Sequence, residues 1–173
     1  MKRRIQPFPM LFVLLAMFTA TVQADELVVD FQDHSPVIVG ESWVEQGLEL
    51  VVVPTGGSQA SAIVSRYGLS ITQAVLSVDM ASLSDVRRAV VEVVTTTGPA
   101  TTTVVLLDED GPIDMVENVD ILHTEYLTVV AGGATARYLQ VGGTNLRLIT
   151  ITIVHGAVGN EAKSWSGIKT LYR

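Results

Sequence analysis

Leu146-Arg147-Leu148-Ile149-Thr150-Ile151-Thr152-Ile153 alternates apolar and polar side chains along most of its length. An alternation with period two is typical of a β-strand that has one buried face. The apolar positions change phase after Leu148, so that in a regular strand Leu146 and Leu148 would point to one face and the three isoleucines to the other. Two interpretations fit this one-residue slip: a β-bulge, or an undisturbed strand with two partly apolar faces.

The strand-forming composition extends over residues 25–173, of which Val, Ile and Thr make up about a third. β-Branched side chains fit a pleated sheet better than a helix. Glycines and prolines separate the apolar runs. A short helix is allowed only around Ser58–Arg66. We expect ten strands, at Glu26–Phe31, Leu48–Val53, Ala74–Met80, Ala89–Thr95, Thr102–Asp108, Ile113–Glu117, Tyr126–Val130, Ala136–Val141, Leu146–His155 and Ser164–Leu171.

These runs and breaks predict an all-β protein, with residues 25–173 forming a single antiparallel β-sandwich of jelly-roll type. The segment Gly98-Pro99-Ala100 lies between two Thr triplets. We interpret it as a loop rather than an O-glycosylated linker, because apolar strand patterns continue on both sides of it. The glycine pairs at 56–57, 132–133 and 142–143 are predicted to form hairpin turns.

Residues 1–24 have the pattern of a secretory signal peptide. Lys2, Arg3 and Arg4 form a basic start, Met10–Phe18 is apolar, and Val22-Gln23-Ala24 has the small or aliphatic residues of a cleavage site. A membrane anchor is the alternative, but a spanning helix needs about 20 mostly apolar residues. We therefore expect cleavage after Ala24 and an exported protein, periplasmic or extracellular, whose mature chain has no membrane span.

Composition excludes several classes of function. The sequence has no cysteine, so disulfides, thiolate metal sites and a cysteine nucleophile are ruled out. The formal charge is −7, and three of the 11 basic residues lie in the predicted signal peptide. Nucleic-acid binding needs a concentrated positive surface, which the scattered cations do not supply. We expect no nucleic-acid partner and interpret the acidic surface as a source of solubility.

Several short motifs follow one another in a familiar order. Trp43-Val44-Glu45-Gln46-Gly47-Leu48 comes first, Val104-Val105-Leu106-Leu107-Asp108-Glu109-Asp110-Gly111 runs from a strand into an acidic turn, and Tyr138-Leu139-Gln140-Val141-Gly142-Gly143 comes later. This order resembles the secreted jelly-roll domains of the galactose-binding-like group, which includes many carbohydrate-binding modules. The resemblance implies a carbohydrate ligand. Domains of the galactose-binding-like group often have an Asp in the last strand, where it can help to hold a structural cation. The corresponding segment here, Trp165–Leu171, has no acidic residue, which argues against such a cation.

Acidic residues are densest between Asp108 and Asp120. A calcium site would use several carboxylates, but the spacing does not match an EF-hand loop. We favour a solvated hairpin turn at Glu109-Asp110-Gly111-Pro112, and predict no bound metal. The three histidines, His34, His123 and His155, are too far apart in sequence to suggest a zinc site. No nucleophile elbow or phosphate-binding loop is present, so we assign no catalytic residue and no cofactor.

Exposed aromatic side chains are the usual platforms for sugars. Trp43 and Trp165 have small or polar neighbours, and Arg66-Tyr67 precedes Gly68 in a predicted loop. These four residues are the candidate ligand-binding residues. The alternative is that both indoles belong to the core.

The leading functional hypothesis is a secreted, non-enzymatic module that binds an extracellular ligand, with carbohydrate as the first choice by resemblance. The alternative is a structural or assembly component of the cell envelope or extracellular matrix, which would pair with its partners through sheet edges. An unrecognised hydrolase ranks third.

Overall fold

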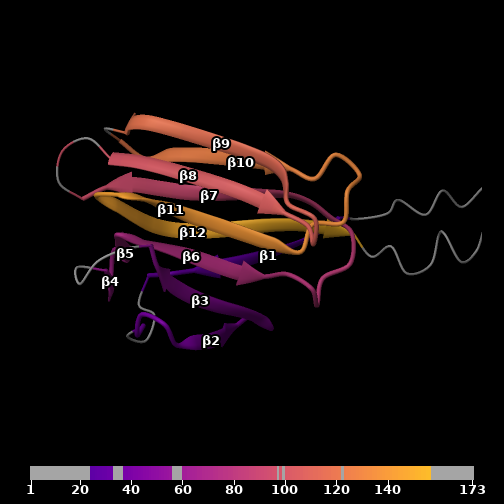
Figure 1. Ribbon diagram of the computed structural model, residues 1–173, viewed down its shortest axis with the longest axis horizontal. Coiled ribbons are helices and arrows are strands. Elements are labelled where there is room, and N and C mark those ends of the chain that lie inside the picture. Colours follow the sequence, from indigo (N-terminus) through magenta and orange to yellow (C-terminus); the bar gives the residue numbers. More distant parts are fainter. Residues whose placement is uncertain are drawn as a thin grey trace, which may run out of the picture.

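The computed structural model describes residues 24–32, 37–55, 60–96, 98, 100–121 and 123–156. Within these ranges the chain forms strands that stack as two layers (Figure 1). No helix in them is long and apolar enough to span a membrane. The predicted all-β fold, an antiparallel β-sandwich of jelly-roll type, is confirmed.

Each layer is a six-stranded sheet. Sheet A has the order β10-β7-β12-β5-β4, with β1 also paired to β12. Its strands are β1 (Ala24–Asp30), β4 (Ser61–Ser65), β5 (Gly68–Thr72), β7 (Val86–Thr95), β10 (Glu125–Val130) and β12 (Leu146–Gly156). Sheet B has the order β2-β3-β6-β11-β8-β9. Its strands are β2 (Ser42–Glu45), β3 (Leu48–Pro54), β6 (Ala74–Asp79), β8 (Ala100–Leu107), β9 (Pro112–Ile121) and β11 (Tyr138–Thr144).

The phase change in the longest strand, β12, is a β-bulge. Leu148 pairs with Val93 of β7, whereas Thr150 pairs with Glu92, so Ile149 is the extra residue on β12. Leu146 and Leu148 are buried before the bulge, and Ile151 and Ile153 are buried after it. The bulge therefore returns the later isoleucines to the core face, and the alternative of an undisturbed strand is wrong.

The bulge also marks a change of neighbour on the other edge of β12. Leu146–Leu148 pairs with β5, whereas Thr150–Gly156 pairs with β1. Gly68, the first residue of β5, lies so close to this junction that a Cβ on it would fall 2.1 Å from the Leu148 carbonyl oxygen. Gly68 also has a φ of 118°, a conformation that side-chain-bearing residues rarely adopt. Both observations require glycine where β5 meets β12.

The core lies between the sheets and consists almost wholly of aliphatic side chains. Each strand contributes alternate residues, as in β6, where Ala74, Leu76 and Val78 are buried and their neighbours are not. Phe31 is the large aromatic side chain that is fully buried. Regular alternation in most strands explains why their positions could be predicted from the sequence.

The short helix that the sequence allows around Ser58–Arg66 is not formed at Ser61–Ser65, which is strand β4, paired with β5. This strand lies at the edge of sheet A, and none of its residues is fully buried: Ile63 is exposed and the others are half-buried. The position of β4 at the edge of the sheet explains why its sequence lacks the apolar–polar alternation that predicts a strand. Strands β2 and β5 were not predicted because each is short, with four and five residues respectively. The strand predicted at Ser164–Leu171 lies outside the described residues.

The glycine pair Gly142-Gly143 lies within β11, so its predicted role as a hairpin turn is wrong. The turn between β11 and β12 is formed instead by Asn145, with a φ of 53°. A Cβ on Gly143 would lie 2.0 Å from the Thr101 carbonyl oxygen of β8. The pair is needed for close approach between strands. Gly132-Gly133 forms a turn, with positive φ at both residues, but it connects β10 of sheet A to β11 of sheet B, so the prediction of a hairpin there is also wrong.

We predict that Gly143→Ala lowers the free energy of unfolding by about 3 kcal/mol, because the new methyl group collides with backbone that cannot move without breaking the β8–β11 pairing. Gly142→Ala is the matched control. Its Cβ would meet a side-chain methyl of Val75 at 2.9 Å, which can shift, so a loss below about 1.5 kcal/mol is expected. Urea denaturation measures both; equal losses would contradict the packing argument.

Candidate functional site

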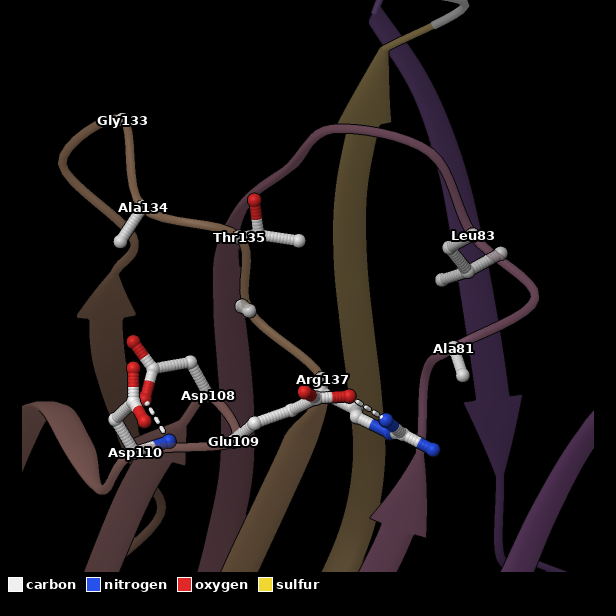
Figure 2. A pocket seen from close by; sticks show the side chains of 10 residues that line it. Ala81, Leu83, Asp108, Glu109, Asp110, Gly133, Ala134, Thr135 and Arg137 are labelled. Carbon is white, nitrogen blue, oxygen red and sulfur yellow. Dashed lines mark hydrogen bonds and ion pairs between the residues drawn. The ribbon is translucent and has the colours of Figure 1, made fainter.

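Three connections at one end of the sandwich surround a cavity of about 680 Å³. They are the β6–β7 connection, the β8–β9 turn and the β10–β11 connection, which Figure 2 shows from close by. The lining residues are Ala81, Leu83, Asp108, Glu109, Asp110, Gly133, Ala134, Thr135, Ala136 and Arg137. We call this space the end cavity. Its lining combines small apolar side chains with three carboxylates, one hydroxyl group and one guanidinium group.

The acidic wall of the end cavity is the β8–β9 turn. One carboxylate oxygen of Asp108 accepts hydrogen bonds from the backbone N–H of Asp110 at 2.8 Å and of Gly111 at 2.9 Å. The Asp108 N–H donates to the Gly111 carbonyl at 3.0 Å, and Gly111 has a φ of 146°. The predicted acidic hairpin turn with glycine at its tip is confirmed.

Arg137 is the basic group of the end cavity. Its Nη1 donates to Oε1 of Glu109 across the opening (Figure 2). The guanidinium carbon also lies 5.3 Å from the ring centroid of Tyr138. Tyr138 and, more weakly, Glu109 raise the pKa of Arg137 above its ordinary value, because negative charge on either group favours the guanidinium cation. Arg137 therefore stays charged at every physiological pH.

The backbone of the β10–β11 connection is fixed by hydrogen bonds at both of its ends. The Arg137 N–H donates to the Leu107 carbonyl at 2.7 Å, and the Arg137 carbonyl accepts from the Met80 N–H at 2.7 Å. At the other end, the Ala131 N–H donates to the Arg87 carbonyl at 2.8 Å. These bonds tie the connection to β7, to β8 and to the start of the β6–β7 connection. The end cavity is thus held open by ordered backbone.

The three carboxylates of the end cavity do not have the paired arrangement of glycosidase carboxylates. Asp108, Glu109 and Asp110 all belong to one turn, so no two of them face each other across the end cavity, as the acid and base of a glycosidase do. Asp108 is engaged by backbone N–H groups, and Glu109 by Arg137. Over the described residues, no group of three or more His, Cys, Asp or Glu side chains could hold a metal ion.

A smaller hollow of about 360 Å³ lies on the outer face of sheet B. Its floor is formed by Gly142 and Gly143, and its sides include Gln73, Thr103 and Gln140. The hollow exists because β11 has no side chains at these two positions. It contains no charged group.

Of the four sequence-predicted site residues, the three in the described part of the chain, Trp43, Arg66 and Tyr67, line neither hollow. Trp43 lies on β2, pairs with the buried Leu50, and packs partly buried against the core. This position favours the alternative in which the indole is a core residue. Trp165 lies outside the described residues. Arg66 and Tyr67 form the tip of the β4–β5 hairpin, and Tyr67 is 50% exposed.

Sequence reasoning identified one wall of the end cavity but missed its basic group. The acidic cluster was visible as consecutive residues, Asp108 to Asp110. Arg137 lies 28 positions after Glu109 in the sequence and belongs to no recognisable motif. Only the pairing of β8 with β11 brings the two segments together, since Tyr138 pairs directly with Leu107.

Comparison with known proteins gives little further guidance. No protein family and no curated protein matches the chain. A solved structure described as "CBM4 structure and function" is similar, with 9% sequence identity and a TM-score of 0.27; the match covers 76% of this chain and 86% of that chain. A TM-score of 0.27 means that the two backbones superpose poorly. The geometry of the site is therefore the basis for assigning a function.

We predict that Asp108→Ala lowers the free energy of unfolding by about 1 kcal/mol, because two backbone N–H groups of the turn lose their acceptor. Asp110→Ala, which removes the neighbouring carboxylate but neither of these bonds, should change it by less than about 0.5 kcal/mol. Thermal melting measures both. Adding a chelator should leave the melting temperature of the unmodified protein unchanged, and a drop restored by calcium would contradict the solvated turn.

Proposed function

We propose that this protein is a secreted, non-enzymatic β-sandwich module that binds carbohydrate in the end cavity. The observation that carries the proposal is the convergence of Glu109, Asp110, Thr135 and Arg137 on one cavity of about 680 Å³. This volume lies within the ~300–1,000 Å³ common for small-molecule sites. It suffices for a short stretch of sugar residues.

The polar groups suit a ligand that is rich in hydroxyl groups. A sugar hydroxyl both donates and accepts hydrogen bonds, so it can bridge a carboxylate acceptor and a guanidinium donor that lie side by side. Glu109 and Arg137 form such a pair. Hydrogen bonds to charged groups are also stronger than those between neutral groups. Ala81, Leu83 and Ala134 supply small apolar contacts for the C–H face of a sugar ring.

Two further observations support a binding role outside the cell. The carboxylates of the end cavity lie on one turn and not opposite each other, which suits a ligand that is held and not hydrolysed. Residues 1–24 have the pattern of a secretory signal peptide, and an exported protein would meet envelope, matrix or environmental glycans. The periplasm and the extracellular medium both fit.

The proposal predicts that Arg137→Ala weakens binding to the preferred glycan by about 10-fold or more, because a charged hydrogen-bond donor is lost. A glycan array identifies the ligand, and isothermal titration calorimetry then measures the affinity. Arg88→Ala is the matched control, since Arg88 is exposed on β7 and does not line the end cavity. Equal affinities for the two variants, or no binding to any glycan, would contradict the proposal.

A second candidate function is assembly through a sheet edge, and strand β4 favours it. Among the described strands β4 pairs with β5 alone, so no described strand covers its other edge. The strand Ser61–Ser65 contains no charged residue and no proline, the features that usually protect such edges. Ile63 is 62% exposed on it. A second copy of the chain could pair with this edge.

If β4 mediates assembly, the protein should form oligomers at high concentration, and Ile63→Lys should keep it monomeric because a charge disfavours edge pairing. Val44→Lys is the control on β2, the edge strand of sheet B, where Val44 is 71% exposed. Sedimentation velocity distinguishes the outcomes. A protein that is monomeric at all concentrations would eliminate this candidate.

A further inference from the structure

A cluster of two arginines and a tyrosine lies on the outer face of sheet A, away from the end cavity. The guanidinium carbon of Arg66 is 4.7 Å from the ring centroid of Tyr67, and that of Arg147 is 5.5 Å from the same centroid. Arg147 belongs to β12, between the buried Leu146 and Leu148, so its side chain points away from the core. We call Arg66, Tyr67 and Arg147 the arginine–tyrosine cluster.

The two guanidinium groups are held in place by the protein itself. Arg66 Nη2 donates to the Tyr67 hydroxyl group, and Arg147 Nε donates to Ser70 Oγ at 3.3 Å. Ser70 lies directly opposite Arg147 in the pairing of β5 with β12. The ring also attracts both cations through its π face. Because both guanidinium carbons are within 5.5 Å of one ring centroid, a saccharide that contacts the ring and carries an anionic group can reach both of them.

No described carboxylate forms a salt bridge with Arg66 or Arg147. The adjacent row on the same face contains Asp30, Thr150, Glu92 and Tyr126, which pair across β1, β12, β7 and β10. Both Glu92 oxygens are engaged there, one by the Tyr126 hydroxyl at 3.1 Å and the other by the Thr150 hydroxyl at 3.0 Å. Asp30 accepts from the Gln32 N–H at 2.8 Å.

The ion pairs recorded for the described residues involve other arginines, Arg87 with Asp85 and Arg137 with Glu109. Neither Arg66 nor Arg147 forms a salt bridge within the described residues, although the chain has 18 acidic and only 11 basic residues. Their guanidinium groups keep a positive charge and hydrogen-bond donors that an anion could use. The arrangement therefore indicates a ligand with negative charge.

We propose that the arginine–tyrosine cluster binds the anionic group of an acidic saccharide, a carboxylate or a sulfate. The saccharide part of this inference rests on the proposed function, and the anionic part rests on the cluster alone. The two planar guanidinium groups would hold the anion by charge-assisted hydrogen bonds. The half-exposed ring of Tyr67 would contact the sugar that carries it. Affinity should fall as salt is added, because the cluster is at the surface.

The test measures binding of the full chain to four polysaccharides by calorimetry at low and high salt. Polygalacturonate carries carboxylates and its methyl ester does not; dextran sulfate carries sulfates and dextran does not. We expect binding to at least one charged member and weaker binding to its neutral counterpart. Arg147→Gln and Arg66→Gln should each lower that affinity by about 10-fold or more. Two variants are used so that a folding defect in one leaves the other informative.

Arg88→Gln is the matched control, because it removes the same charge from an exposed position on the same sheet without touching the Tyr67 ring. It should change the affinity less than twofold. Equal losses in Arg88→Gln and Arg147→Gln, or no binding to either charged polymer, would overturn the proposal. The Arg137→Ala variant distinguishes binding in the end cavity from binding at the arginine–tyrosine cluster, because it changes only the end cavity. If neutral glycans never bind but a charged polymer binds through Arg147, the end-cavity function fails and the cluster stands.

Discussion

The pairing of β12 with three other strands is the constraint on which sheet A depends. One edge of β12 pairs with β7 along its length, while the other is shared by β5 and β1. A regular strand could not bury both Leu148 and Ile151, because they would point to opposite faces. The bulge at Ile149 resolves this conflict, and it lies where β5 gives way to β1. One inserted residue therefore allows both Leu148 and Ile151 to be buried, and it lies at the point where the neighbouring strand changes.

The end cavity depends on the pairing of strands in sheet B. In sheet B, β8 and β11 are neighbours, so the acidic turn after β8 lies next to the connection that leads into β11. Glu109 and Arg137 meet because their strands pair, and the glycines of β11 let those strands approach closely. Rigid strands thus place charged side chains from separate loops around one space, the usual way in which a sandwich acquires a binding site.

The two candidate sites differ in charge, so the two proposals assign them different classes of ligand. Three carboxylates and one guanidinium group line the end cavity, which suits a neutral polyol. The arginine–tyrosine cluster has two guanidinium groups beside one exposed ring and suits an anion. On a chain of negative net charge, the cluster is a local exception that long-range attraction does not reinforce. Binding of an anion there would depend on direct contacts.

The sequence by itself determined the local features of this protein. Alternation between apolar and polar residues is a property of the chain, so it revealed most strands and the phase slip after Leu148, while consecutive turn-forming residues revealed the turn at Gly111. The tertiary structure decided the features that depend on which strands pair with each other. Ser61–Ser65 is an edge strand, Gly143 faces the backbone of β8, and Arg137 contacts Glu109 for this reason. These features arise from pairing between residues far apart in the chain, and no local pattern records which strands will be neighbours.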